Sequence, residues 1–327
     1  MPETNFPNLA DVFMARKRIK NMVVKTPLIK STSLSRLAGA DVYLKLETVQ
    51  PTGSFKARGA ANKIVSLSPE QKENGVIAFS TGNHGRAVAE MSRRFGLKSV
   101  ICLSERVPSF RVEAMRALGA EVVAYGQSQD EAYAKALSIQ KERNLTMVAP
   151  FDDPMVISGQ GTIALEIFED LPETASVAVP LSGGGLFAGV AMAAKSINPK
   201  TKLIGVSMAV APAMIRSLEA GKPVEIPEKD SLADALLGGI GLDNQYTFPM
   251  TRQYIDQQIL VSEEEIGAAM VHAFLNERRV IEGSGAVGIA ALLAGKLKTP
   301  GPIVLVISGG NVDPRQLHDL VAAKIDQ

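Results

Sequence analysis

One lysine and three glycine-rich turns are the residues of this chain best suited to chemistry. Lys56 lies in the run Pro51-Thr-Gly-Ser-Phe-Lys-Ala-Arg-Gly59, and the turns are Ser80-Thr-Gly-Asn-His-Gly85, Ser182-Gly-Gly-Gly-Leu186 and Ser308-Gly-Gly-Asn311. A lysine amine can form an imine with an aldehyde, and a glycine loop can hold a phosphate with its backbone N–H groups. Together the four segments offer what an aldehyde cofactor with a phosphate group requires.

Short β-type runs alternate with helical patterns along almost the whole chain, and these elements must position the four segments. This alternation predicts an α/β fold of two domains, with parallel-rich sheets flanked by helices. Ligands of such sheets bind at the carboxyl ends of strands, where the three turns fall. Strands are predicted at 42–46, 75–79, 99–103, 121–125, 146–149, 176–179, 202–206, 258–261 and 302–307, and helices include 84–95, 109–118, 130–143 and 263–277.

In this order and spacing, the four segments resemble the fold-type II pyridoxal-phosphate (PLP) enzymes, which include tryptophan synthase β, threonine dehydratase and serine racemase. The resemblance extends from about Thr26 to about Asn311. It implies PLP as the cofactor and a tryptophan-synthase-β-like fold. It also implies a small domain of residues 75–149 inserted in a large PLP-binding domain of residues 1–74 and 150–327, with the cofactor in the cleft between them.

The same resemblance implies roles for individual cofactor-binding residues. Lys56 would bind the aldehyde and abstract the substrate Cα proton, and Phe55 would support one face of the ring. Asn83 would bond the ring hydroxyl, Ser308 would face the ring nitrogen, and Glu282 would lie near the cleft. The phosphate would be held by Gly183, Gly184, Gly185 and Leu186.

The turn after residue 79 would hold the substrate carboxylate. Thr81 is a second catalytic candidate, because serine racemases carry at this position a serine that protonates the second face of Cα. His84 invites a general-base role, but with no acidic residue within a few positions we interpret it as a structural ring. The expected substrate-binding residues are Ser80, Thr81, Gly82, Asn83 and His84.

A further glycine-rich run, Gly283-Ser-Gly-Ala-Val-Gly288, matches the dinucleotide-binding pattern G-x-G-x-x-G. That site requires a strand directly before the glycines and an acidic residue at the end of the next strand. Here a predicted helix and a short loop precede the run, and the next strand ends at Ser308. We therefore interpret the run as a helix N-terminus.

The residue facing the ring nitrogen favours elimination chemistry. A neutral serine hydroxyl leaves the ring unprotonated and a weaker electron sink, which favours loss of a β-substituent over transamination. Residues 80–87, 150–154 and 159–162 look most like hydroxyectoine-utilisation dehydratases, with phenylserine dehydratases close to them. We therefore expect an ammonia-lyase that converts a β-hydroxy-α-amino acid (threonine, serine, phenylserine or a hydroxyectoine-derived amino acid) into a 2-oxo acid and ammonia.

Other interpretations remain open from the sequence. A serine or threonine racemase would use Thr81 as the second acid–base group, and a non-catalytic amino-acid-binding protein would tolerate loss of Lys56. Phe110 either lines an apolar substrate pocket or lies at a helix start. No metal site is expected, because residues 207–214 lack the carboxylates that metal-assisted relatives carry there and the next acidic residue is Glu219.

Composition limits the cellular setting and the partners. The 35 basic and 34 acidic residues are balanced, so no nucleic-acid or membrane partner is expected. The single cysteine, Cys102, excludes an internal disulfide and is expected to pack in the core. The sequence shows neither a signal peptide nor an apolar run of about 20 residues. We expect a cytoplasmic enzyme with a small amino-acid substrate, assembled as a homodimer or a larger homo-oligomer.

Overall fold

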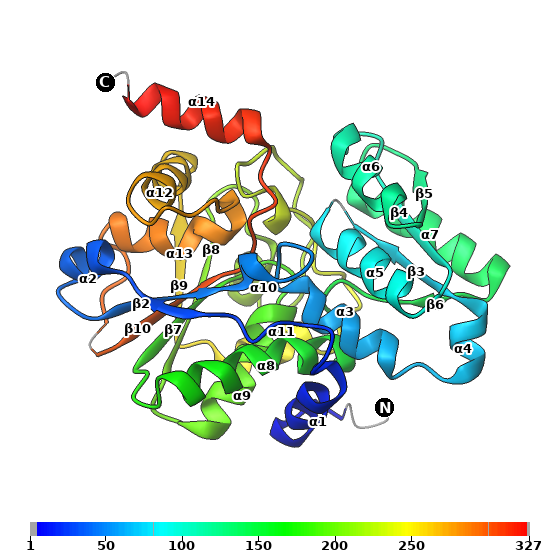
Figure 1. Ribbon diagram of the computed structural model, residues 1–327, viewed down its shortest axis with the longest axis horizontal. Helices are drawn as coiled ribbons and strands as arrows, with labels where there is room; N and C mark the ends of the chain where they lie inside the picture. Colours follow the sequence, from blue (N-terminus) through cyan, green and yellow to red (C-terminus); the bar gives the residue numbers. More distant parts are fainter. Residues whose placement is uncertain (1–4, 81, 300, 326–327) are drawn as a thin grey trace.

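The computed structural model describes residues 5–80, 82–299 and 301–325. Its strands form two sheets with helices packed around them (Figure 1). Among the described strands, neighbours are parallel except for β1 with β2. The larger sheet has the order β1 (Leu28–Lys30), β2 (Val42–Leu46), β10 (Ile303–Ile307), β7 (Ser176–Pro180), β8 (Lys202–Met208), β9 (Gln257–Val261), and the smaller has the order β5 (Glu121–Ala124), β4 (Ser99–Leu103), β3 (Val76–Phe79), β6 (Thr146–Met147).

The helices divide between the two sheets. Around the smaller sheet lie α4 (Pro69–Asn74), α5 (Asn83–Arg94), α6 (Ser109–Ala117) and α7 (Gln129–Arg143). The remaining helical elements are α1 (Leu9–Ile19), α2 (Thr32–Ala38), η1 (Glu47–Val49), α3 (Lys56–Val65), α8 (Pro154–Asp170), α9 (Gly185–Ile197), α10 (Ala213–Ala220), η2 (Asp234–Leu236), α11 (Thr247–Tyr254), α12 (Glu263–Leu275), α13 (Gly283–Leu293) and α14 (Pro314–Ile325).

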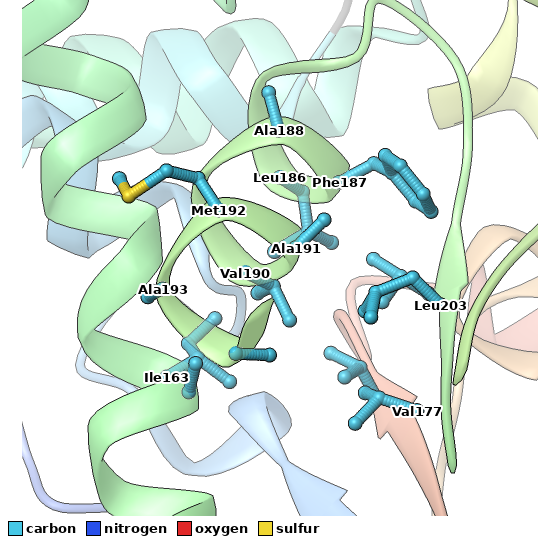
Figure 2. Close-up of a cluster of buried hydrophobic side chains, with 14 of the residues drawn as sticks. Ile163, Val177, Leu186, Phe187, Ala188, Val190, Ala191, Met192, Ala193 and Leu203 are labelled. Carbon is cyan, nitrogen blue, oxygen red and sulfur yellow. The ribbon is translucent and has the colours of Figure 1, made fainter. Parts of the chain in front are cut away.

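Side chains that alternate along the strands of the larger sheet enter two different cores. Val177 and Val179 of β7 pack with α8 and α9, whereas Ala178 between them packs with α12 and α13. Figure 2 shows part of the first core, where side chains of α9 lie near Val177 and Leu203 of the sheet. Since the strands are buried on both faces, they read in the sequence as continuous apolar runs.

The helix that begins at Lys56 lies between the two sheets (Figure 1). Ala57, Ala60 and Ile64 of α3 share a core with Val76 of β3, so this helix packs against the smaller sheet. All four strands of that sheet fall within residues 76–147. The expected domain boundaries at 74/75 and 149/150 remain a prediction.

The structure agrees with most predicted elements and differs at a few ends. The antiparallel edge strand β1 was not expected, because three residues are too short to show an alternating pattern. The interpretation of Gly283 as a helix start is confirmed, since α13 begins there with Glu282 as its N-cap. Cys102 is buried in β4, and burial raises the pKa of its thiol to about 11. Within the described ranges, no helix is both long and apolar enough to cross a membrane.

Candidate active site

A cavity of about 400 Å³ is lined by residues that follow strands of both sheets. Ser80 follows β3 of the smaller sheet, and Ser182 and Ser308 follow β7 and β10 of the larger one. Lys56 and Phe55 also line the cavity. The carboxyl ends of parallel strands thus bring the three turns together, as the sequence predicted.

The lysine turn reaches the cavity through backbone pairing with the end of β10. Ser54 forms an isolated antiparallel bridge with Gly309. The N–H of Phe55 donates to the carbonyl oxygen of Ser308 at 2.9 Å, and the N–H of Gly310 donates to Gly53 at 3.0 Å. These contacts place Lys56, 252 residues before Ser308 in the chain (308 minus 56), in the same cavity.

Lys56 is a half-buried residue whose amine, among the described residues, bonds a backbone carbonyl and not a carboxylate. Its Nζ donates to the carbonyl oxygen of Pro150 at 2.6 Å and lies 5.2 Å from the centre of the Phe55 ring. Burial lowers the pKa of Lys56 to about 8, because a desolvated ammonium loses hydration that the neutral amine does not need. A neutral amine is the form that attacks an aldehyde and accepts a proton.

The glycine loop before α9 is open to an anion. Gly184 has φ 85° and is the N-cap of α9, with no side chain capping the helix. The first N–H groups of a helix lack i−4 carbonyl partners, and the dipole there favours negative charge. A Cβ at Gly183 would lie 2.3 Å from the ring of Phe151, so that position has no room for a side chain. Nearby, the buried hydroxyl of Thr251 has no hydrogen-bond partner among the described residues. The loop therefore fits a phosphate.

Asn83 is held by two polar residues from the other side of the cavity. Its Nδ2 donates to Oε1 of Glu282 at 2.6 Å, and its Oδ1 accepts from Nδ2 of Asn311 at 2.6 Å. Burial, reinforced by Asp234, raises the pKa of Glu282 to about 7. Asp234 in turn pairs with Arg111 of α6 at 2.6 Å, so ionic contacts also join the two sides.

The substrate turn is only partly described. The N–H of Gly82 donates to the Ser80 hydroxyl at 3.1 Å, and Thr81 lies outside the described residues. His84 is buried, and its Nε2 pairs with the carbonyl oxygen of Val148 at 2.7 Å. Burial and the nearby Lys56 charge lower the pKa of His84 to about 3, which favours the structural interpretation over a general base. Phe110 is 40% exposed and is not among the cavity residues, so it does not line the pocket.

Several cavity residues were not singled out from the sequence. Phe79 and Tyr133 pair with their ring centroids 4.5 Å apart, and the segment 235–241 lies among the lining residues. The Asp152 carboxylate accepts from the N–H groups of residues 245–247 at 2.8–2.9 Å, which anchors the start of α11. No local motif marks Phe79, Tyr133 or the segment 235–241, because they meet only in the folded chain, whereas Asp152 lies in the run 150–154 that carries part of the family resemblance. The parts of the chain that the structure describes hold no group of three or more His, Cys, Asp or Glu side chains suited to a metal.

Comparison with known proteins gives matches over nearly the whole chain. The family model described as "Pyridoxal-phosphate dependent enzyme" matches residues 19–309. A "Putative threonine dehydratase" of Sinorhizobium fredii is 49% identical, with 96% of this chain and 95% of that protein covered. The L-threonine ammonia-lyase of Thermotoga maritima is 43% identical, with 96% and 78% covered. The structure of maize serine racemase superimposes with a TM-score of 0.91 at 33% identity, covering 98% of this chain and 99% of that one.

Proposed function

Because this chain belongs to the family of pyridoxal-phosphate-dependent enzymes, with PLP as its cofactor, we propose that it is an ammonia-lyase for a β-hydroxy-α-amino acid. The products would be a 2-oxo acid and ammonia. Relatives named threonine dehydratase and threonine ammonia-lyase support a dehydratase of hydroxy amino acids. We place the reaction in the cavity at Lys56.

The observation that carries the proposal is the arrangement of polar groups around Lys56. Among the described cavity residues, Lys56 supplies the sole amine, and the pKa of His84, lowered to about 3, makes its ring a weak base. Elimination needs one base at Cα, which Lys56 would supply, and the proton that it takes can leave with the β-hydroxyl as water. Racemisation needs a second acid–base group on the opposite face of Cα.

Each remaining residue is proposed to hold or orient the reactants. PLP, when bound, withdraws electrons from Cα and so acidifies its C–H bond. Lys56 would hold the cofactor aldehyde until the substrate amine takes its place, and the freed Nζ would then remove the Cα proton. Gly183 to Leu186 would hold the phosphate with backbone N–H groups, and Asn83 and Ser308 would bond the ring. The N–H groups of residues 80–84 would hold the substrate carboxylate.

The residues of the cavity wall indicate which substrate side chains the cavity favours. Phe79, Tyr133 and Met147 line it together, and the two rings pack against each other. An apolar wall of this kind favours a substrate with an aromatic or other apolar group on Cβ, because burial of that group removes apolar surface from water. We therefore propose phenylserine as a substrate beside threonine and serine. Hydroxyectoine-derived amino acids remain candidates.

The decisive experiment measures all products from one incubation. Threonine, serine, phenylserine and a hydroxyectoine-derived amino acid are each incubated with the PLP-loaded enzyme. Ammonia and 2-oxo acid are quantified, and the residual amino acid is separated by chiral chromatography. We expect elimination to exceed formation of the enantiomer by at least roughly tenfold, on the order of 1.4 kcal/mol in barrier height.

The variant Lys56→Ala should lose turnover by several orders of magnitude. Lys63→Ala is the matched control, because Lys63 lies on the same helix but pairs with Asp153 outside the cavity. Predominant D-amino acid would make the enzyme a racemase. Absence of any product, with PLP bound, would instead favour a binding protein.

A further inference from the structure

Asn311, the last residue of the third glycine-rich turn, is joined to four residues by hydrogen bonds. Its backbone N–H donates to Oε2 of Glu282 at 3.1 Å. Its Nδ2 donates to the carbonyl oxygen of Thr52 at 2.9 Å and to Oδ1 of Asn83 at 2.6 Å. Its Oδ1 accepts from Nη1 of Arg86 at 2.8 Å. The Asn311 side chain therefore connects α5 with the lysine turn.

The chemistry of these partners decides how each amide is oriented. A guanidinium only donates hydrogen bonds, so the oxygen of the Asn311 amide must face Arg86. Its NH₂ group then faces Asn83, which must present its own oxygen in return. On the other side of Asn83, the Glu282 oxygen accepts from Nδ2, which agrees with the same orientation. These hydrogen bonds form one series that begins at a donor and ends at an acceptor, in the order Arg86, Asn311, Asn83 and Glu282.

This series leaves one group of Asn83 for a ligand. Nδ2 carries two hydrogens, and the donor bond to Glu282 uses one of them. Asn83 also lines the cavity, so its second N–H is available there. A carbonyl oxygen cannot take that place, because Oδ1 is turned toward Asn311.

The backbone around the series is shaped to admit these side chains. A Cβ at Gly53 would lie 2.5 Å from Oδ1 of Asn311, and a Cβ at Gly309 would lie 2.4 Å from Oε1 of Glu282. Two glycines of the motifs thus leave room for the polar groups. The space beside Gly53 and Gly309 is filled by the side chains of Asn311 and Glu282 and not by a ligand.

We propose that Asn311, oriented by Arg86, is a positioning residue that makes Asn83 a hydrogen-bond donor toward the ring oxygen of PLP. An N–H donor stabilises the deprotonated form of that oxygen, whereas a carbonyl would require the protonated form. The inference rests on the proposed contact between Asn83 and the ring. It adds two residues, Asn311 and Arg86, that need not touch the cofactor.

The isosteric variant Asn311→Asp tests this role. The new carboxylate can still accept from Arg86 but cannot donate to Oδ1 of Asn83, so the preference of the Asn83 amide for one orientation is lost. At fixed pH, we expect the ratio of visible to near-ultraviolet absorbance of bound PLP to fall about two- to tenfold, the factor for one hydrogen bond. The PLP dissociation constant, from titration of PLP-free protein, should rise by a similar factor.

A second variant distinguishes a loss of positioning from a loss of folding. Arg86→Met removes the donor that orients Asn311, and we expect it to change the absorbance ratio in the same direction by a smaller factor. Arg93→Met is the control, since Arg93 lies on the same helix and pairs with Glu90. Both arginine variants should keep the circular dichroism spectrum of the unmodified enzyme.

The outcomes separate this inference from the proposed function. Absorbance ratios and PLP affinities that are unchanged in Asn311→Asp would overturn the positioning role, even if the enzyme eliminates water from threonine. An enzyme that binds PLP but catalyses no elimination would overturn the proposed function, while the spectra would still decide the role of Asn311. A shift in Arg93→Met equal to that in Arg86→Met would also contradict the inference.

Discussion

At the scale of single residues, the cavity lowers the pKa of Lys56, the one amine among its described lining residues. Among the described residues, the amine of Lys56 bonds a backbone carbonyl and not a carboxylate, so no opposite charge offsets its loss of hydration. Its pKa of about 8 lies below the ordinary value of 10.5. Near neutral pH, a larger fraction of this amine is therefore neutral than of a surface lysine.

The first prediction concerns the rate at which PLP attaches to PLP-free protein. Below pH 8 Lys56 is mostly protonated, so the rate should rise about tenfold per pH unit and level off above about pH 8. Stopped-flow absorbance between pH 6 and 10 measures it, with free N-acetyl-lysine methyl ester as the control amine. A rate that continues to rise to pH 10, like that of the control, would contradict the lowered pKa.

Ser308 gives the second prediction at this scale. If its hydroxyl faces the ring nitrogen, Ser308→Asp should favour a protonated ring, which is a stronger electron sink. We expect elimination to fall relative to transamination and the absorbance of bound PLP to change. Product partition and spectra are compared with the unmodified enzyme. Unchanged partition together with unchanged spectra would show that Ser308 does not contact that nitrogen.

At the scale of elements, the start of α9 combines an unusual backbone conformation with N–H groups that are suited to an anion. Gly184 has a positive φ that side-chain-bearing residues rarely adopt, and it precedes the free N–H groups of the helix. A Cβ there would also lie 2.7 Å from Cε of Met214. The strand β7, the glycine loop and the helix α9 together fix the position of these N–H groups.

The third prediction is that Gly184→Ala weakens PLP binding by at least roughly tenfold, about 1.4 kcal/mol, because the loop must shift away from the phosphate. Gly221→Ala is the matched control, since Gly221 also has a positive φ (72°) but no atom lies within 4 Å of its added Cβ. Both variants should lose about 1 kcal/mol of stability from backbone strain. Equal PLP dissociation constants for the two variants would contradict a phosphate-binding role.

At the scale of the whole molecule, a buried ionic cluster joins segments distant in the sequence. Arg58 of α3 donates to Glu47 of η1 at 2.7 Å and to Glu166 of α8 at 2.6 Å. Lys45 of β2 donates to the same Glu166 at 2.7 Å. Burial alone would raise the pKa of Glu166, but Arg58 and Lys45 outweigh burial and lower it. The cluster connects the helix that begins at Lys56 to η1 and α8.

The fourth prediction is that Arg58→Met lowers the free energy of unfolding by about 3–5 kcal/mol, because buried Glu47 loses its ion pair and Glu166 keeps only the one with Lys45. Chemical denaturation measures this loss. The control Arg216→Met removes half of an exposed pair with Glu219 and should change stability by no more than about 0.5 kcal/mol. Similar losses in the two variants would contradict the importance of the buried cluster.

The homo-oligomeric state and the cytoplasmic location remain predictions.

The sequence by itself determined the strand–helix alternation, the family resemblance and the turns that meet at the cavity. It could do so because each turn follows an apolar strand and the carboxyl ends of parallel strands share one edge. The helix start at Gly283 could likewise be predicted from the sequence, because it depends only on the helix and loop that directly precede it in the chain.

Only the tertiary structure decided the surroundings of these turns. The lowered pKa of Lys56 follows from its burial beside Pro150. The wall of Phe79 and Tyr133 joins a strand and a helix, and the two rings are 54 residues apart in the chain (133 minus 79). The Asn311 contacts link residues from both halves of the chain. Desolvation and hydrogen-bond direction depend on distances between such segments, and no local pattern of residues encodes those distances.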